Sequence, residues 1–377
     1  MRILILLAAL VAIAPPAPTR VTVAQLEQIL TTACAAHKSD TQIVRQIRPL
    51  ELTERLTETT LGRLTADLAS FPETVQSLQL LADQSIFLMP PASEIPAIAP
   101  LDGSAQQRML EAARNYVAQT LPLLPNFLAT RTTRYFDNSP QQLTKNAWPV
   151  SVGLHLVGTS SREISVREDR ETLSPAAASG ARQEQPKSEL TSWGEFGPML
   201  TMILADTANG KVSWSHWEQI SAGPVAVLNY SVPKAFSHYV VADSTPQDAP
   251  VEDSRHSPIG LQQGLDVSRA TRYRIRPGYH GSLWLDPTTG AILLFSIEAD
   301  LKDRDPVKRA GALVEYGPVS VGGRNFICPM RSLTIHIDPI DPNDISGATP
   351  LLKLNENLFT NYHLFASTTR ILTEGQP

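Results

Sequence analysis

The sequence predicts an α+β protein: an N-terminal helical unit followed by a large, curved antiparallel sheet that stays open like half a barrel and encloses an apolar helix. Three observations predict this class. Apolar residues recur at helical spacing over residues 21–89, a proline-rich linker spans 90–103, and about ten short strand-like segments at hairpin spacing follow within 104–377. A chain of 377 residues has room for both units.

The N-terminus predicts export. Arg2 precedes an apolar run over residues 3–14, followed by small residues and prolines, so residues 1–20 are expected to be a signal peptide and the protein to be periplasmic or extracellular. Later apolar stretches fall short of transmembrane length, so we expect no membrane span once this segment is removed. A net charge of −5 without a lysine- or arginine-rich run argues against nucleic acid as a partner.

Four helices are expected in the helical unit. Their starts carry capping boxes, in which a Ser or Thr side chain caps the third helical amide and a Gln or Glu reaches back. The boxes are Thr22 with Gln25, Ser39 with Gln42, and Ser70 with Glu73. The segment 52–68 carries leucines at the same spacing and is expected to form the third helix. We interpret these leucines as packing residues rather than as a ligand site.

After the linker, Ser104 with Gln107 is expected to cap a further helix that opens the β-rich region. Two polar stretches, 174–189 and 243–258, interrupt the strands and are predicted to be mobile loops. Between them, the segment 197–210 begins with Gly-Pro, ends in Gly and is apolar nearly all round. This pattern indicates a helix that is buried on most sides.

The strongest candidate for chemistry is Asp286, in the stretch DPTTG between two apolar strands. Pro287 fits the second position of a type I turn, and an aspartate at the first position accepts hydrogen bonds from the turn amides. Gly290 suits a left-handed backbone position. Asp286 is therefore interpreted as a turn residue, neither catalytic nor metal-binding.

The sequence carries no recognisable enzyme signature, phosphate loop or zinc-binding cysteine pair, so no catalytic residue, cofactor or metal ligand is expected. His216 and Glu218 lie two apart and would share one face of a strand. With His238 or His280 they would form part of a metal site, or of a hydrolase site without a known motif. A half-exposed strand histidine is the commoner result of such spacing.

Aromatic residues gather in the β-rich region and define a candidate ligand cavity. Its residues are expected to be Trp214, Trp217, Phe236, Trp284 and Met202. Trp214 and Trp217 are three apart, so on a regular strand they would point to opposite faces, as in a sheet covered on both sides. Ordinary core packing is the alternative, which we favour for these side chains because aromatic residues are mostly packing residues.

The chain has two cysteines, Cys34 and Cys328. In an exported protein they could form a disulfide. Two separate buried thiols are the alternative, which we favour because the sequence does not give the distance between them.

Two resemblances rest on these residues. A group of uncharacterised secreted bacterial proteins is similar in the segments GEFGPMLTMIL, WSHWEQ, YHGSLWLDPTTGAILLF, VEYGPVSVGG and NYHLF. More distantly, the Gly-x-Leu-x-Leu-Asp hairpin at 281–286, the VEYGPV strand and the embedded helix resemble the periplasmic lipoprotein carriers of the outer-membrane sorting system and their lipid-binding relatives. That resemblance covers residues 126–371 and implies an open antiparallel half-barrel with helices as plug or lid, which holds acyl chains in its cavity.

We therefore expect a non-catalytic envelope protein that binds a lipid, a lipoprotein or another apolar ligand in its curved sheet. The alternative is an interaction module with a filled core, whose helical unit docks an envelope protein partner. A hydrolase without a known motif, around His216 and Glu218, is a third hypothesis. A cavity in the sheet favours the first function, and a filled core with an exposed apolar patch favours the second.

Overall fold

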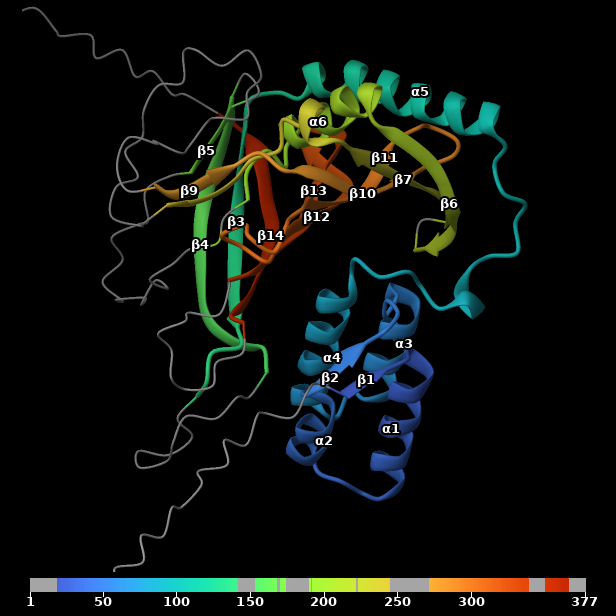
Figure 1. Ribbon diagram of the computed structural model, residues 1–377, viewed down its shortest axis with the longest axis vertical. Coiled ribbons are helices and arrows are strands. Elements are labelled where there is room, and N and C mark those ends of the chain that lie inside the picture. Colours follow the sequence, from blue (N-terminus) through green and yellow to red (C-terminus); the bar gives the residue numbers. More distant parts are fainter. Residues whose placement is uncertain are drawn as a thin grey trace, which may run out of the picture.

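The structure is a computed structural model that describes residues 19–141, 153–167, 170–173, 190, 192–221, 223–244, 271–338 and 350–365. Within these ranges, ten strands pair into one antiparallel sheet in the order β5-β4-β3-β14-β13-β12-β11-β10-β7-β6 (Figure 1). The outer strands β5 and β6 do not pair with each other, so the sheet stays open. The predicted α+β class with an open antiparallel sheet is confirmed.

The strands of this sheet are β3 (Phe127–Asp137), β4 (His155–Arg167), β5 (Arg170–Leu173), β6 (Lys211–Ile220), β7 (Gly223–Val232), β10 (Gly278–Leu285), β11 (Ile292–Asp300), β12 (Arg309–Val321), β13 (Arg324–Ile337) and β14 (Leu352–Leu364). A separate hairpin pairs β8 (Val241–Ser244) with β9 (Thr271–Ile275). The predicted signal-peptide residues 1–18, the loop 174–189 and the part 245–258 of the second loop lie outside the described residues.

The N-terminal unit contains α1 (Val23–Ala35), α2 (Asp40–Ile47), α3 (Glu58–Asp67) and α4 (Pro72–Ser85) around its own apolar core. The capping boxes at Thr22 and Ser39 form as predicted. A small parallel pair, β1 (Thr19–Val21) with β2 (Leu50–Leu52), adds to this unit. Thr19 and Arg20, assigned to the signal peptide, therefore lie in a strand, and Leu52 lies in β2 rather than in the third helix.

Helix α4 begins differently from the prediction. Its N-cap is Phe71, without a side-chain hydrogen bond, rather than Ser70. The Asp40 carboxylate of α2 accepts from the amides of Glu73 and Thr74, at 2.9 and 2.8 Å. A side chain from another helix thus satisfies the free amides that a local capping box would have served.

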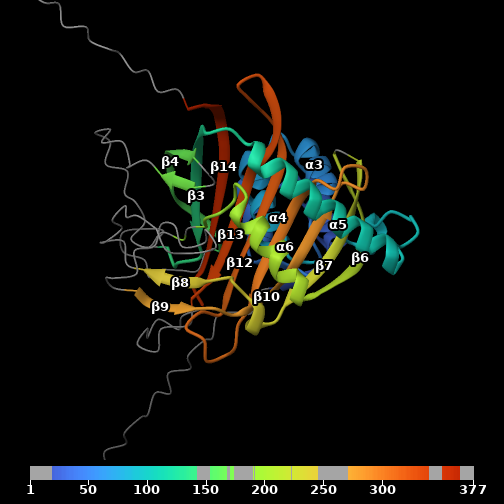
Figure 2. The ribbon, with the colours of Figure 1, turned by 90° about the horizontal axis from the view of Figure 1, so that it is seen from above.

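Two helices cover one face of the sheet. They are α5 (Gly103–Thr120) and α6 (Pro198–Asp206), and in Figure 2 both lie in front of the strands while the N-terminal helices lie behind. The α5–α6 face carries, among others, Leu228, Leu283, Phe295 and Val314. As predicted, α6 is buried on nearly all sides. Among the helices of the described ranges, none is both long enough and apolar enough to cross a membrane.

The start of α5 and the linker before it differ in detail from the prediction. Asp102 caps α5 by accepting from the Ala105 amide at 2.7 Å, whereas Ser104 was expected to be the cap. Short 3-10 turns flank the helix: η1 (Ala92–Glu94) within the linker and η2 (Leu121–Leu123) after its end. Two more, η3 (Thr207–Asn209) and η4 (Lys234–Phe236), follow α6 and β7.

The opposite face of the sheet, which bears Val227, Trp284 and Leu313, docks the N-terminal unit. An apolar cluster joins α4 to this face, with Leu80 and Ile86 packed among residues of β3, β12, β13 and β14. An ion-pair cluster reinforces the contact. Arg331 of β13 binds Asp83 of α4 at 2.6 Å, and also Glu315 and Glu356 at 3.0 and 2.8 Å.

The last strand of the sheet is longer than the sequence indicates. We expected it over NYHLFASTTRI, whereas β14 starts at Leu352 and runs between β3 and β13. Its first half, LKLNEN, is polar. The side chains of Asn355, Glu356 and Asn357 can be buried there because they are hydrogen-bonded within the protein. Hydrophobic alternation cannot detect such a strand.

The turn at Asp286 is confirmed. Its carboxylate accepts from the amide of Thr288 at 2.7 Å and from that of Thr289 at 3.4 Å, and the Gly290 amide donates to the Asp286 carbonyl at 2.9 Å. Gly290 has a φ of 75°. Partial burial works against ionisation, yet the turn hydrogen bonds hold the pKa of Asp286 below its usual value.

Candidate functional site

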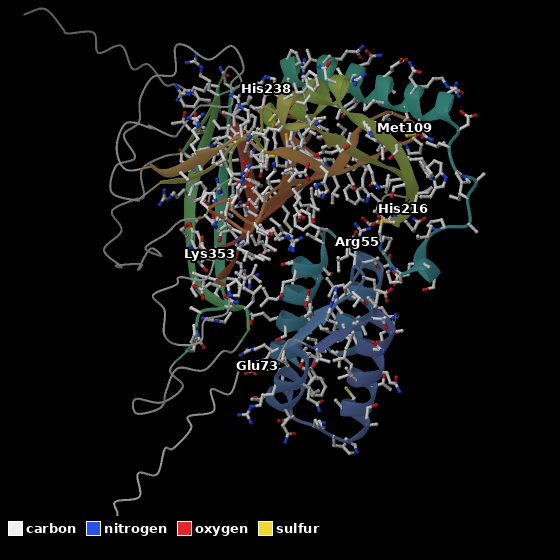
Figure 3. All side chains as sticks on the ribbon, in the orientation of Figure 1. Arg55, Glu73, Met109, His216, His238 and Lys353 are labelled. Atoms are coloured by element: carbon white, nitrogen blue, oxygen red, sulfur yellow. The ribbon has the colours of Figure 1, made fainter. Side chains whose placement is uncertain are left out.

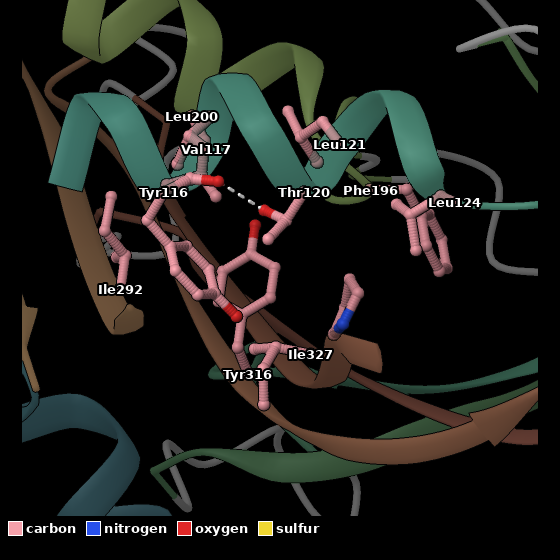
Figure 4. Close-up of a pocket in the computed structure, with 11 residues that line it drawn as sticks. Tyr116, Val117, Thr120, Leu121, Leu124, Phe196, Leu200, Ile292, Tyr316 and Ile327 are labelled. Carbon is pink, nitrogen blue, oxygen red and sulfur yellow. Dashed lines mark hydrogen bonds between the residues drawn. The ribbon is translucent and has the colours of Figure 1, made fainter. Parts of the chain in front are cut away.

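A cavity lies between α5, α6 and the sheet (Figure 4). Side chains from both helices and from the sheet surround it. They are Tyr116, Val117 and Thr120 of α5, Leu121 and Leu124 after it, Phe196 and Leu200 at α6, and Ile292, Tyr316, Ile327 and Pro329 of the sheet. The amphipathic pattern of α5 and the buried helix α6 therefore create this site by packing on the same face of the sheet.

The lining is mainly apolar, with three hydroxyl groups among it. The Thr120 hydroxyl donates to the Tyr116 carbonyl at 2.7 Å, and the Tyr316 hydroxyl donates to the Glu195 carbonyl at 2.6 Å. The empty space measures about 370 Å³ when its open side is included, but only about 30 Å³ can hold the centre of a water molecule. The cavity has the composition of a small-molecule site and, as it stands, room for about two waters.

A buried polar network borders the cavity at Phe196 and Tyr316. Glu171 of β5 accepts from the amides of Gly194 and Phe196, at 3.1 and 2.9 Å. Burial, together with the charge of neighbouring Glu195, raises the pKa of Glu171 to about 7. The carboxylate thus fixes the backbone that carries one cavity residue, Phe196.

Trp214 and Trp217 lie on the same face of the sheet, contrary to the prediction. Trp214 pairs with Leu228 and Trp217 with Ala226, and a bulge at Ser215 takes up the extra residue. The bulge shifts the alternation by one position, so both rings point to the α5–α6 face and meet edge to face, with centroids 5.3 Å apart. A spacing of three indicates opposite faces only on a regular strand.

The predicted cavity residues do not line one cavity. Met202 is fully buried in α6, and Trp217 donates through Nε1 to the Ala99 carbonyl at 2.8 Å. Trp284 points to the opposite face of the sheet. Phe236 is 46% exposed on η4. None of the five residues is among those that surround the cavity between α5, α6 and the sheet.

His216 and Glu218 share a face of β6, as the spacing predicts, at the junction with the N-terminal unit. His216 Nε2 lies 3.2 Å from Glu218 Oε2, which also accepts from Trp284 Nε1 at 2.8 Å and forms an ion pair with Arg55. Figure 3 shows Arg55, on the side of the N-terminal unit that faces the sheet, next to His216. Burial opposes ionisation, but the hydrogen bond from His216 and the charge of Arg55 lower the pKa of Glu218.

The other candidate histidines lie elsewhere. His238 binds the buried Asp206 through Nδ1 at 2.6 Å, and His280 binds Asp300 at 2.7 Å. Among the described ranges, no group of three or more His, Cys, Asp or Glu side chains is arranged to hold a metal ion.

Both cysteines are free. Cys34 packs in the N-terminal unit, whereas Cys328 is buried in β13, so the disulfide considered above is not formed. Burial raises the pKa of the Cys328 thiol to about 12, which keeps it protonated and unreactive at neutral pH.

Sequence reasoning missed the residues that line the cavity. Tyr116 and Val117 lie in the helix expected after Ser104, and Leu200 lies in the buried helix expected over 197–210, but no local signal shows that the two helices cover the same strands.

Searches of protein-family models and of curated proteins found no match. Among solved structures, the chain is similar to an outer membrane lipoprotein-sorting protein domain from Vibrio parahaemolyticus, with 11% identity and a TM-score of 0.27. The match covers 72% of this chain and 95% of that domain. It agrees with the distant resemblance that the sequence indicated, and a superposition this loose says nothing about what this protein binds.

Proposed function

We propose that the protein is an envelope protein that binds an acyl chain of a lipid or lipoprotein, or another apolar ligand, between α5, α6 and the sheet, with no chemical step at that site. The observation that carries the proposal is the cavity described above, because an apolar lining with a few hydroxyl groups is typical of a site for an amphipathic molecule. The hydrophobic run at residues 3–14 supports the location in the envelope.

Binding a chain of several methylene groups requires α5 to move, because the cavity holds only about two waters. Helix α5 is suited to this. Of its 18 residues only Ala113 and Val117 are buried, whereas six of the nine residues of α6 are. Displacing α5 would therefore expose the α5–α6 face at a smaller cost in buried area than displacing α6.

A second function, an interaction module that docks an envelope protein partner, is favoured by one specific observation. The core between α5, α6 and the sheet is nearly filled, with eighteen buried residues of the described chain in a single cluster. A protein of this kind would bind its partner through its surface and carry no ligand in the core.

The deciding experiment is native mass spectrometry of the protein purified from the periplasm, followed by solvent extraction and lipid analysis. We expect stoichiometric extra mass that extracts as lipid. A bare chain mass, with no uptake after incubation with phospholipid vesicles, would contradict ligand binding and favour the interaction module.

A matched pair of variants locates the ligand. Leu124 lines the cavity and is half-buried, whereas its neighbour Leu123 is 70% exposed. Leu124→Trp enlarges a side chain that lines the cavity and should reduce bound lipid, while Leu123→Trp should leave it unchanged. Equal retention by the two folded variants would place the ligand elsewhere.

A further inference from the structure

The bulge of β6 builds a second polar cluster, which the proposed function does not use. Ser215 is the extra residue of the bulge, and its Oγ lies 2.9 Å from Nδ1 of the adjacent His216. On the other side of the imidazole, Nε2 lies 3.2 Å from Glu218 Oε2. A hydroxyl, an imidazole and a carboxylate are therefore in hydrogen-bond contact in sequence.

The surroundings of Glu218 fix how protons are arranged in this cluster. Three donors converge on its Oε2: His216, the indole N–H of Trp284 at 2.8 Å, and the Arg55 guanidinium. An ionised carboxylate only accepts hydrogen bonds, so His216 Nε2 carries its proton. When the imidazole is neutral, its lone pair is then on Nδ1, 2.9 Å from the Ser215 hydroxyl, where it can accept the hydroxyl proton.

We propose that Ser215, His216 and Glu218 form a nucleophilic site for carboxylic esters, with Ser215 as nucleophile, His216 as general base and Glu218 as the residue that orients the imidazole. Ser215 is half-buried, and its Oγ lies 3.9 Å from Sδ of Met89, which is 50% exposed. The apolar Met89 side chain beside the hydroxyl suits an ester with an apolar acyl group.

The reaction balances with water as the only co-reactant. Ser215 Oγ forms a bond to the ester carbonyl carbon while its proton passes to His216 Nδ1, and the same proton then leaves with the alcohol as the ester C–O bond breaks. Water attacks the resulting acyl-serine, gives a proton to His216 and releases the carboxylic acid. The serine hydroxyl then recovers its proton from His216.

The cluster lies where the N-terminal unit contacts the sheet. The alternative to an ester-hydrolysing site is therefore a structural role, in which His216, Glu218 and Arg55 only hold the N-terminal unit against the sheet. A fluorophosphonate carrying a fluorophore separates the two cases, because it phosphonylates an activated serine with loss of fluoride. We expect one adduct per chain on Ser215 of the full-length folded protein, located by peptide mapping, and hydrolysis of p-nitrophenyl butyrate that Ser215→Ala abolishes.

Two variants make the test specific. His216→Asn should slow labelling by about 10²-fold or more, the usual effect of losing a general base, in protein whose circular dichroism is unchanged. Glu218→Gln is the second variant, should His216→Asn fail to fold. Ser213→Ala is the matched control, because Ser213 is an exposed serine of the same strand. This variant should be labelled at Ser215 at the rate of the parent protein. An unlabelled Ser215, or labelling that is indifferent to His216 and Glu218, would overturn the proposal.

Discussion

Replacing Arg331 with methionine tests whether the ion-pair cluster holds the N-terminal unit to the sheet. The side chain is 15% exposed, and it joins Asp83 of α4 to Glu315 and Glu356 of the sheet. Methionine keeps the apolar stem but leaves three carboxylates without their shared cation. Removing one partner of a buried pair costs about 3–5 kcal/mol, a large part of the 5–15 kcal/mol that typically stabilises a folded protein.

The pH dependence gives the sign of this effect. Burial raises the pKa of Asp83 and of Glu315 above their usual values, although Arg331 opposes the shift. Without Arg331 these pKa values rise further, so the folded state takes up protons more readily than the unfolded chain. The loss of stability in Arg331→Met should therefore be largest at pH 7 and shrink as the pH falls toward 5.

Urea unfolding at pH 7 and pH 5 measures both effects, with the double variant Asp83→Asn/Arg331→Met expected to recover part of the loss. Arg134→Met is the control, because Arg134 binds the same Glu356 at 2.9 Å but is 31% exposed. Because Arg134 is partly exposed and Glu356 keeps its ion pair with Arg331, the loss should be smaller, nearer the roughly 0–1 kcal/mol of a surface pair. Equal unfolding free energies for Arg331→Met and the parent protein would refute the reasoning.

Three further predictions follow from particular contacts. Gly290→Ala should loosen α5, because the residue has a φ of 75° and an added Cβ would lie 2.8 Å from the carbonyl carbon of Ala112. Increased binding of an apolar dye measures this effect, and unchanged binding would speak against α5 as a movable cover. The free energy of unfolding should fall as the pH rises from about 4.5 to 7, because Glu171 with its pKa of about 7 keeps a proton that the unfolded chain releases. In urea titrations Glu171→Gln should flatten this slope, and an unaltered slope would assign it to other groups. In the native protein a thiol reagent should modify Cys34 but not Cys328, and a reducing agent should leave the melting temperature unchanged. A count of zero free thiols in denaturant would show that a disulfide exists.

Local signals in the sequence were sufficient where one short segment provides the whole structure. The capping boxes at Thr22 and Ser39 contain both partners of each hydrogen bond within four residues, and the Asp286 turn supplies its own acceptor, proline and glycine. The apolar composition of 198–206 likewise predicted its burial, because a helix without a polar face must be covered on all sides. The sequence by itself therefore determined the order of the helical unit and the sheet, the class of fold and the buried helix.

Tertiary structure decided the features that depend on residues far apart in the chain. Asp40 caps α4 from another helix, β14 is polar because its asparagines find partners on neighbouring strands, and the Ser215 bulge brings Trp214 and Trp217 to one face. The cavity arises only because α5 and α6 pack on the same strands, and the Ser215 cluster only because the bulge and Arg55 meet at the docking face. Such contacts depend on the register between strands and on the docking of separate units, and the periodicity of a single segment contains neither.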